Sequence, residues 1–336
     1  MEAKDLYKTL ASVDTGVCVY TYEKCEELIP VINEINKLKK EKNAIILAHT
    51  YVNPEILYGV ADYVGDSYYL SDVARKSDAD RIFFVAVDFM AETAKLLNPE
   101  KKVYKTNNNG GCSLADSITG AEVNALREKY PDHTFICYIN TTADVKAACD
   151  LSVTSSNVYS IVANLDTDKI FFLPDRLMAL NIIDYLKEHK IEKEVLYSSG
   201  SCYVHESYDP EMIDYLKLQN KDISVAVHPE CPPEVIAKAD YVGSTSGIFN
   251  HVNSSDASAY VLVTECGLSS RIRAESPDKK IIGSCNFCRY MQGNNLDLIK
   301  ETIVNESSEM EITLDPLLSE KARKCIERMF SEVEKN

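Results

Sequence analysis

The stretch Ala61-Asp62-Tyr63-Val64-Gly65-Asp66-Ser67 occurs in three related forms along this chain. The second form is Cys149-Asp150-Leu151-Ser152-Val153-Thr154-Ser155, and the third is Ala239-Asp240-Tyr241-Val242-Gly243-Ser244-Thr245. Their aspartates stand 88 and 90 residues apart. A strand-like run precedes each aspartate by about a dozen residues (IILAHTY, FICYINT, SVAVHPE), and another begins twenty-one residues after it (FFVAV, FFLP, VLVT). A repeat of this length is one supersecondary unit used three times.

Each repeat is expected to fold as an α/β unit. Its strands are apolar throughout and alternate with short helices, which is typical of parallel sheets covered on both faces. Each unit reads β-α-β-α-β-α-β, followed by a cysteine-containing loop and a helix. In the first unit we expect strands at Ala44–Ala48, Tyr63–Gly65 and Arg81–Val87, and helices at Pro54–Ala61, from Asp66/Ser67 to Arg75, and at Phe89–Leu97. The predicted fold class is α/β, with three pseudo-threefold-related three-layer αβα domains and ligands at the carboxyl ends of the strands.

The repeat also divides the chain into five segments. Residues 42–131, 132–221 and 222–308 are predicted to be the three α/β repeats. Residues 1–41 form an N-terminal helical extension, and residues 309–336 form a C-terminal helix. Amphipathic patterns at Val31–Lys42 and Leu317–Val333 predict the helices outside the repeat.

Composition excludes several classes of protein. With 336 residues, 45% of them hydrophobic, the chain exceeds one ordinary core. Its net charge of −16 argues against nucleic acid and anionic membrane as partners. The N-terminus does not read as a signal peptide, and no apolar run approaches the roughly 18 residues that span a bilayer. Eleven cysteines, an odd number, favour metal chemistry over a disulfide framework. We expect a cytoplasmic protein.

Three of the cysteines hold the same place in the repeat. Cys112, Cys202 and Cys288 follow the aspartates by 50, 52 and 48 residues. Matching loops of three related units can meet around one axis, so the thiolates can converge on a metal site with a vacant position. The C-x-x-C at Cys285 and Cys288 is by itself compatible with zinc, redox chemistry or chance. An iron–sulfur cluster with one open iron fits three thiolates better than a closed zinc site, but the spacing alone does not decide between them.

The other cysteines are interpreted by their positions. Cys137 and Cys149 fall in a predicted strand and a predicted helix, where they are expected to be small core residues. Cys231 and Cys266 follow strand ends and can approach the site, although a structural role is the simpler interpretation. No partner spacing is seen for the cysteines of the terminal extensions, Cys18, Cys25 and Cys325.

Polar side chains stand where the strands of each repeat end. The first strands end in His49-Thr50-Tyr51, Tyr138-Ile139-Asn140 and His228-Pro229-Glu230, and the second strands end near Ser67, in Thr154-Ser155-Ser156 and in Ser244-Thr245-Ser246. A single hydroxyl at a helix start is ordinarily an N-cap. The denser hydroxyl clusters suit a phosphate at a helix N-terminus. A lone histidine or tyrosine at a strand end is more often structural, but three equivalent strand ends with ionisable or amide groups favour a shared acid–base site.

The motifs themselves closely resemble those of the quinolinate synthase family (iron–sulfur quinolinate synthetase A). LAHTYVNPEI, ADYVGDS, FMAETAKLLNPEKKV, GCSLADS, CYINTTADVKA, VTSSN, HPECPPEVIAKADYVGSTS and CRYMQGNNL follow in the family's order from about Lys39 to Asp297. The resemblance implies three α/β domains around a central [4Fe-4S] cluster and active site, with Cys112, Cys202 and Cys288 as ligands. It implies a condensing and dehydrating transferase of NAD biosynthesis, which joins iminoaspartate and dihydroxyacetone phosphate into quinolinate, phosphate and water. An aspartate-oxidising enzyme that supplies iminoaspartate is a further implied partner.

The family's substrate residues can be carried over position by position. They fall on His49, Tyr51, Ser67, Tyr138, Asn140, Ser155, His205, His228, Glu230, Ser244 and Thr245. Glu230 is the candidate base for phosphate elimination and imine tautomerisation. Tyr51, His49 and His228 are candidate proton donors or relays.

The remaining roles concern substrate binding. Tyr138 and Asn140 are expected to orient the dicarboxylate. Ser155 and Thr245, with their helix N-termini, are expected to hold phosphate or carboxylate groups.

The chain departs from the family's pattern at a few places. Asp88 stands where members often carry a basic residue, and RLMALNI (176–182) replaces the usual Leu-Gly pair. YSSGS before Cys202 lacks the usual tryptophan or glutamine, and a cysteine upstream of Cys285 is missing. These departures leave the cluster and phosphate positions untouched. The alternatives are a same-family paralogue with a different small substrate, another cluster-dependent hydro-lyase, and a non-catalytic iron–sulfur sensor, which would not need a pocket of acids, bases and hydroxyls.

Overall fold

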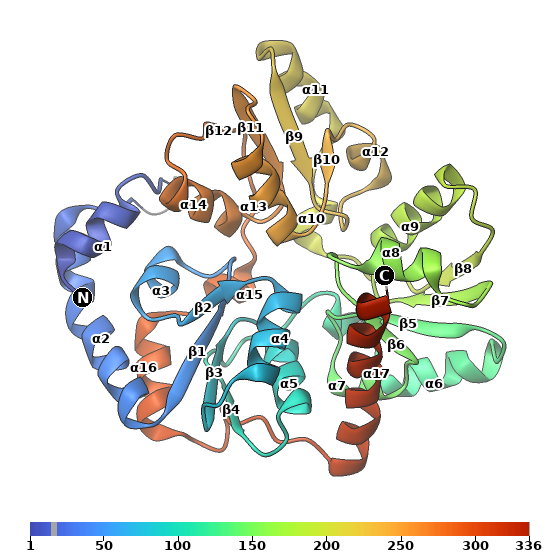
Figure 1. Ribbon diagram of the computed structural model, residues 1–336, viewed down its shortest axis with the longest axis horizontal. Coiled ribbons are helices and arrows are strands. Elements are labelled where there is room, and N and C mark those ends of the chain that lie inside the picture. Colours follow the sequence, from blue (N-terminus) through green and yellow to red (C-terminus); the bar gives the residue numbers. More distant parts are fainter. Residues whose placement is uncertain (15–18, 336) are drawn as a thin grey trace.

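The computed structural model describes residues 1–14 and 19–335. Its named strands form three separate four-stranded sheets, and all of their pairings are parallel. In each sheet the first strand in chain order lies between the second and the third, and the fourth lies outside the third. Figure 1 shows the sheets in three lobes around a common centre. The predicted fold class, three αβα units with parallel sheets, is confirmed.

The first unit contains the sheet of order β2-β1-β3-β4. Its elements are β1 (Ala44–His49), α3 (Pro54–Gly59), β2 (Tyr63–Gly65), α4 (Ser67–Lys76), β3 (Arg81–Val85), α5 (Asp88–Leu97), β4 (Lys102–Lys105), the 3₁₀ turn η1 (Ala115–Ser117) and α6 (Gly120–Lys129). Ile46, Leu47 and Ala48 of the central strand are all buried. Helices cover both faces of the sheet, which explains why the strand is apolar without alternation.

The second and third units repeat this order. The second comprises β5 (Thr134–Tyr138), α7 (Ala143–Ala147), β6 (Leu151–Val153), α8 (Val158–Asn164), β7 (Lys169–Leu173), α9 (Arg176–Glu188), β8 (Glu194–Tyr197), α10 (Tyr203–Glu206) and α11 (Pro210–Gln219). The third comprises β9 (Ile223–Val227), α12 (Pro233–Ile236), β10 (Tyr241–Val242), α13 (Thr245–Ser254), β11 (Ala259–Val263), α14 (Cys266–Glu275), β12 (Ile281–Ile282), α15 (Arg289–Gln292) and α16 (Leu296–Asn305).

The repeated aspartate fastens the second strand of each unit to the first. The side chain of Asp62 accepts a hydrogen bond from Ile46 N at 2.8 Å, and its own backbone N–H donates to Ile46 O at 2.9 Å. Asp150 and Asp240 make the same two bonds with Phe135 and Val225. Each aspartate also faces a basic residue of the helix before the first strand, in the pairs Lys39–Asp62, Arg127–Asp150 and Lys217–Asp240. The motif that reveals the repeat is therefore a structural clamp.

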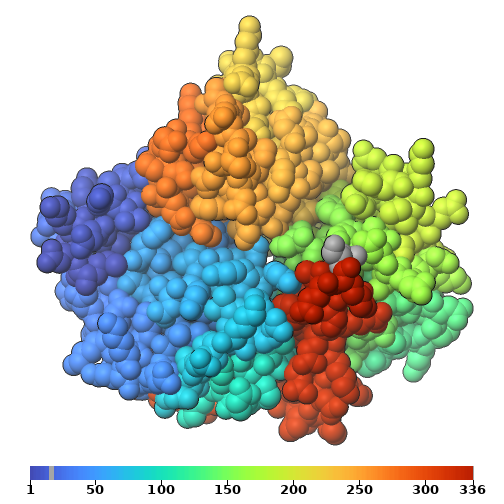
Figure 2. All heavy atoms as spheres, in the orientation of Figure 1, coloured from blue at the N-terminus to red at the C-terminus, as the bar shows by residue number. Residues whose placement is uncertain are grey.

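Terminal helices hold the units together. α1 (Ala3–Leu10) and α2 (Tyr22–Glu41) pack on each other, and α2 also packs against α16. α2 begins nine residues before the predicted Val31 and contains Pro30. The predicted C-terminal helix is α17 (Pro316–Lys335), which contacts α5 of the first unit and α7 and β6 of the second. Figure 2 shows it seated between these units. Among residues 1–14 and 19–335, every helix is too short or too polar to span a bilayer.

The cysteines correct three sequence expectations. Cys266 and Cys285 form a disulfide, so the preference for metal chemistry over disulfides is wrong for this pair. Cys149 lies between α7 and β6 rather than in a helix, although it is buried in the core as expected. Cys325, to which no partner was assigned, has its Sγ 3.7 Å from that of Cys137 in β5. Cys18 lies outside the described residues.

Candidate active site

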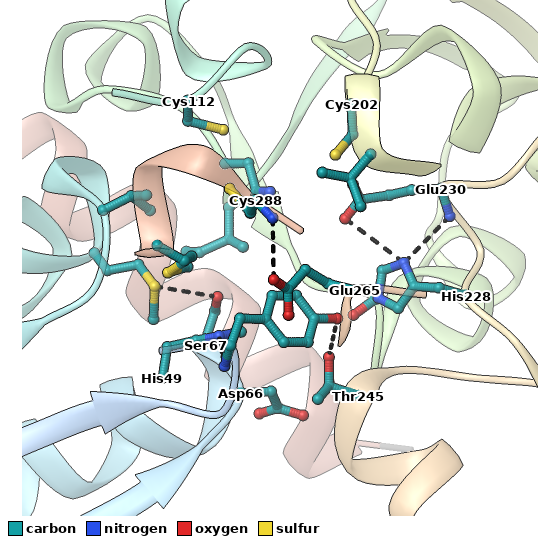
Figure 3. A pocket seen from close by; sticks show the side chains of 18 of the residues that line it. His49, Asp66, Ser67, Cys112, Cys202, His228, Glu230, Thr245, Glu265 and Cys288 are labelled. Atoms are coloured by element: carbon teal, nitrogen blue, oxygen red, sulfur yellow. Dashed lines mark hydrogen bonds and ion pairs between the residues drawn. The ribbon is translucent and has the colours of Figure 1, made fainter. Parts of the chain in front are cut away.

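A cavity lies where the carboxyl ends of the three sheets meet, and residues of all three units line it (Figure 3). Among the predicted site residues, those that line it are His49, Tyr51, Ser67, Cys112, Tyr138, Asn140, Ser155, Cys202, His205, His228, Glu230, Thr245 and Cys288. Ser244 is the exception. Its hydroxyl accepts a hydrogen bond from Gly247 N at 3.1 Å, so it caps α13 in the ordinary way.

Glu230 is the best-connected acid of the cavity. It follows β9, its side chain is 4% exposed, and it accepts a hydrogen bond from the Tyr138 hydroxyl at 2.6 Å. His205 Nδ1 lies 3.1 Å from its second oxygen, and His228 Nδ1 lies 3.7 Å from the first. Burial alone would raise the pKa of Glu230, but the charge of His205 and the hydrogen bonds from His205 and Tyr138 lower it to about 2. Glu230 is therefore ionised in this arrangement.

A second chain of contacts joins the first unit to the third. The hydroxyl of Tyr51, which follows β1, lies 2.7 Å from Thr245 Oγ1 and 3.0 Å from Thr264 Oγ1. Thr264 Oγ1 also lies 3.0 Å from His205 Nε2. One hydrogen-bonded network therefore runs from Tyr138 through Glu230, His205 and Thr264 to Tyr51 and Thr245, across all three units. Sequence reasoning missed Thr264, although its place directly after β11 was a usable signal.

The protonation states in the cavity differ from those in water. Burial lowers the pKa of His49 to about 4 and that of His228, which stacks on His205, to about 3. Burial raises the pKa of Tyr51 and Tyr138 well above its usual value. Near neutral pH the cavity thus presents neutral His49 and His228, two protonated phenols and an ionised carboxylate.

The three repeat cysteines come from equivalent loops after β4, β8 and β12 and all line the cavity. Burial raises the pKa of the Cys112 thiol to about 12 and raises those of Cys202 and Cys288 as well. A soft metal group would supply the positive charge that buried thiolates need.

The number of thiols bears on the kind of metal group. Cys202 also stands beside His205 and Glu230, and the donor atoms of these three residues all lie within 4.8 Å of one another. A closed zinc site takes four protein ligands, whereas an iron–sulfur cluster can be held by thiolates with one iron left open. Three cysteines from equivalent loops therefore suit a cluster better than a closed zinc site.

An anionic ligand in this cavity would be bound by neutral hydrogen-bond donors and not by lysine or arginine side chains. In the described part of the chain, the residues lining it include no lysine or arginine. Hydroxyls stand instead at the helix starts: Ser67 and Thr245 are the first residues of α4 and α13, and Ser155 precedes α8. Helix N-termini of this kind favour negative charge through free backbone N–H groups and the helix dipole.

Residues 33–331 match the model of the protein family described as "Quinolinate synthetase A protein". The chain belongs to the quinolinate synthase family. A quinolinate synthase of Aquifex aeolicus is 44% identical over 312 residues, which cover 91% of this chain and 95% of the relative. Quinolinate synthases of Sinorhizobium medicae and Caulobacter vibrioides are 41% and 40% identical and cover 93% and 90% of this chain, and 88% and 81% of their own lengths.

The departures from the family's pattern lie outside the cavity lining. Asp88 forms an ion pair with Lys105 at 2.8 Å and lies beneath Gly110, whose hypothetical Cβ would come within 2.1 Å of its carboxylate. Arg176 pairs with Glu206 at 3.0 Å. Asn181 donates hydrogen bonds to two backbone carbonyls next to Glu230. Cys231 and Cys266 are buried and do not line the cavity.

Glu265 is a lining residue that sequence reasoning missed in this quinolinate synthase family member. It caps α14, 1% exposed, and accepts hydrogen bonds from Gly267 N at 2.6 Å and Cys288 N at 3.0 Å. Burial raises its pKa to about 8. The signal was the third strand of the repeat: Asp175 and Glu265 both stand two residues after such a strand, and both cap the helix that follows.

Proposed function

We propose that this protein is a quinolinate synthase that condenses iminoaspartate with dihydroxyacetone phosphate to give quinolinate, phosphate and water, in the de novo biosynthesis of NAD. Family membership supports the activity. The observation that carries the proposal is the cavity itself, where three equivalent cysteine loops meet one network of acids, bases and hydroxyls.

We further propose that Cys112, Cys202 and Cys288 hold a [4Fe-4S] cluster. The fit rests on their chemistry and placement: three thiols from equivalent loops line one cavity, and no fourth cysteine stands among the described lining residues. A bound cluster with one iron free of protein ligands supplies a Lewis acid for substrate oxygens.

Proton transfers are assigned to the hydrogen-bonded network. Glu230 is ionised and is the candidate base. Its basicity increases when a substrate displaces the Tyr138 hydroxyl, because that hydrogen bond helps to hold its pKa down. Tyr51 is the candidate proton donor, and neutral His49 and His228 are candidate relays.

Binding is assigned to the neutral donors of the cavity. Tyr138 and Asn140 would orient the dicarboxylate, with His205 next to it. Ser67, Ser155 and Thr245 would hold phosphate or carboxylate oxygens, through their hydroxyls and helix N-termini. Ser244 contributes indirectly in this proposal, by capping α13 beside Thr245.

The decisive experiment is an anaerobic assay. The reconstituted protein is incubated with aspartate, an aspartate-oxidising enzyme and dihydroxyacetone phosphate, and quinolinate is measured by chromatography. We expect quinolinate and phosphate in equal amounts. A cluster-loaded protein that consumes either substrate without forming quinolinate would instead point to a paralogue or another hydro-lyase.

We also propose that the chain divides at residues 42, 132, 222 and 309, that it works in the cytoplasm, and that an aspartate-oxidising enzyme supplies its iminoaspartate.

A further inference from the structure

The loop that carries Glu230 is held by hydrogen bonds from a neighbouring unit. Asn181 lies in α9 of the second unit and is 4% exposed. Its Nδ2 group donates to Pro229 O and to Cys231 O, each at 2.8 Å. These carbonyls belong to the residues directly before and after Glu230. A single amide therefore holds the loop on both sides of this side chain.

The loop that carries Asn140 is held by hydrogen bonds of the same kind. Lys146 lies in α7 and is fully buried. Its Nζ donates to Ile139 O at 2.9 Å and also to Thr141 O. These carbonyls again belong to the residues directly before and after one that lines the cavity, Asn140. Two unrelated side chains thus make the same flanking contact at two strand ends.

Both side chains are costly to bury. Asn181 Oδ1 is buried without a hydrogen-bond partner, and an unsatisfied buried polar atom costs roughly 1–3 kcal/mol. Lys146 places an ammonium in the core, where its neighbours are the Phe89 ring at 5.5 Å, the Glu92 carboxylate and the thiols of Cys137, Cys149 and Cys325. Neither group reaches solvent or lines the cavity. What each delivers is a pair of hydrogen bonds to a site loop.

We propose that Asn181 and Lys146 are positioning residues that hold Glu230 and Asn140, respectively, in the geometry that the reaction needs. The inference rests on the roles proposed above for those two residues. Asn181 has an additional consequence: because α9 belongs to the second unit and Glu230 to the third, it makes the placement of the acid depend on how these units meet.

The test replaces each donor by an apolar side chain of similar volume. Asn181→Leu is expected to lower kcat about tenfold or more with little change in the KM for dihydroxyacetone phosphate, because misplacing a reacting group by about 1 Å can cost up to ~100-fold. Lys146→Met is expected to weaken binding of quinolinate, used as a stable dicarboxylate probe, by about tenfold. Iron and sulfide contents should be unchanged in both.

Two matched controls separate positioning from simple loss of a buried donor. Asn36 donates through Nδ2 to Ile32 O at 3.0 Å and Gly59 O at 2.7 Å. Lys39, 7% exposed, donates to Val60 O at 2.7 Å and also pairs with Asp62 at 2.8 Å, so its loss is the more severe control. Neither lines the cavity. Asn36→Leu and Lys39→Met should lower the melting temperature while kcat and quinolinate affinity stay normal.

Hydrogen exchange of the holoenzyme tests the positioning without relying on catalysis. The amides of His228, Glu230 and Cys231 should exchange faster in Asn181→Leu, and those of residues 139–142 in Lys146→Met, but in neither control. If an apolar variant does not fold, Asn181→Ser or Lys146→Gln shortens the donor and should give the same changes in smaller size. Normal exchange and normal kinetics in the folded variants, or equal effects in the controls, would overturn the proposal.

Glu230→Gln and Asn140→Ala are assayed alongside. If these two are kinetically normal while exchange rises in the Asn181 and Lys146 variants, the roles proposed for Glu230 and Asn140 fail and the positioning of the loops stands. If Glu230→Gln and Asn140→Ala impair the enzyme but the Asn181 and Lys146 variants leave kinetics and exchange unchanged, the positioning inference fails alone.

Discussion

At the residue scale, the cavity works by keeping groups of very different acidity within hydrogen-bonding distance of one another. Glu230 is held ionised by its neighbours although it is buried, while Tyr51 and Tyr138 are held protonated by the same burial. A substrate entering this network exchanges existing hydrogen bonds for its own. Small rearrangements can therefore move a proton without bringing in water.

Loss of any repeat cysteine should remove the metal. Cys112→Ala, Cys202→Ala and Cys288→Ala are expected to lose the iron–sulfur chromophore and the activity, because a cluster cannot be held by two thiolates in a buried cavity. Absorption spectra and iron and sulfide analysis check this. Cys25→Ala, buried at 0% exposure in α2, is the control and should keep its iron while losing up to a few kcal/mol of packing energy. Iron retained in Cys202→Ala would disprove the three-ligand assignment.

Glu230 and Thr245 should separate catalysis from binding. Glu230→Gln is expected to bind dihydroxyacetone phosphate but to turn over at least ~100-fold more slowly, as loss of general acid–base catalysis implies. Thr245→Val should chiefly raise the KM for that substrate, by roughly the 1.5–3 kcal/mol of a hydrogen bond to a charged group. Steady-state kinetics of the cluster-containing enzyme measures both effects. Near-normal turnover in Glu230→Gln would leave Tyr51 or His228 as the candidate base.

At the element scale, local sequence patterns predicted most strands and helices because each unit repeats the same order of apolar segments. The strand ends and cysteine loops came with them, so nearly all of the predicted site residues line one cavity. Contacts between elements distant in the chain were not. The Cys266–Cys285 disulfide, the Cys137–Cys325 contact and the grip of Asn181 on the Glu230 loop join segments whose proximity depends on packing. No local periodicity carries that information.

The end of α16 should show a pH-dependent contribution to stability. Glu306 pairs with Lys42 at 2.7 Å and Arg81 at 3.1 Å. Partial burial opposes ionisation of Glu306, but the hydrogen bonds from Lys42 and Arg81 outweigh it and lower its pKa. Because the folded pKa is below the unfolded value of about 4.3, the stabilisation is complete above that value and is lost as the pH falls through the folded pKa.

Denaturant unfolding of Glu306→Gln checks this expectation. The variant should be less stable than the parent at pH 7 by on the order of 1 kcal/mol, since partly solvated ion pairs are worth little more. The difference should shrink as the pH falls below about 4. Glu320→Gln, which removes only an exposed pair with Lys324, is the control. A difference that is constant between pH 7 and pH 3 would contradict the charge-based explanation.

At the scale of the whole molecule, the site exists only while three units stay in register. Tyr51 of the first unit reaches Thr245 of the third, Tyr138 of the second reaches Glu230 of the third, and α17 bridges the first and second. Each unit has its own sheet, but none carries a complete set of acid, base and cysteine ligands. We call the contacts between units seams. Activity should therefore respond to substitutions at these seams, even when every residue that lines the cavity is left unchanged.

Gly267 tests this dependence on the seam between the first and third units. It lies in α14, where an added Cβ would come within 2.5 Å of Tyr51 Cα and 2.7 Å of Thr50 O. Gly267→Ala should push the Tyr51 segment away from Thr245 and lower kcat/KM by about tenfold or more, with the iron content unchanged. Gly120→Ala is the control, because its Cβ would meet the backbone oxygen of Asp144 at 2.6 Å, away from the cavity. It should lower the melting temperature but leave kcat/KM per folded molecule normal. If the two alanine variants lose activity equally, or if Gly267→Ala is fully active, the seam does not control the site.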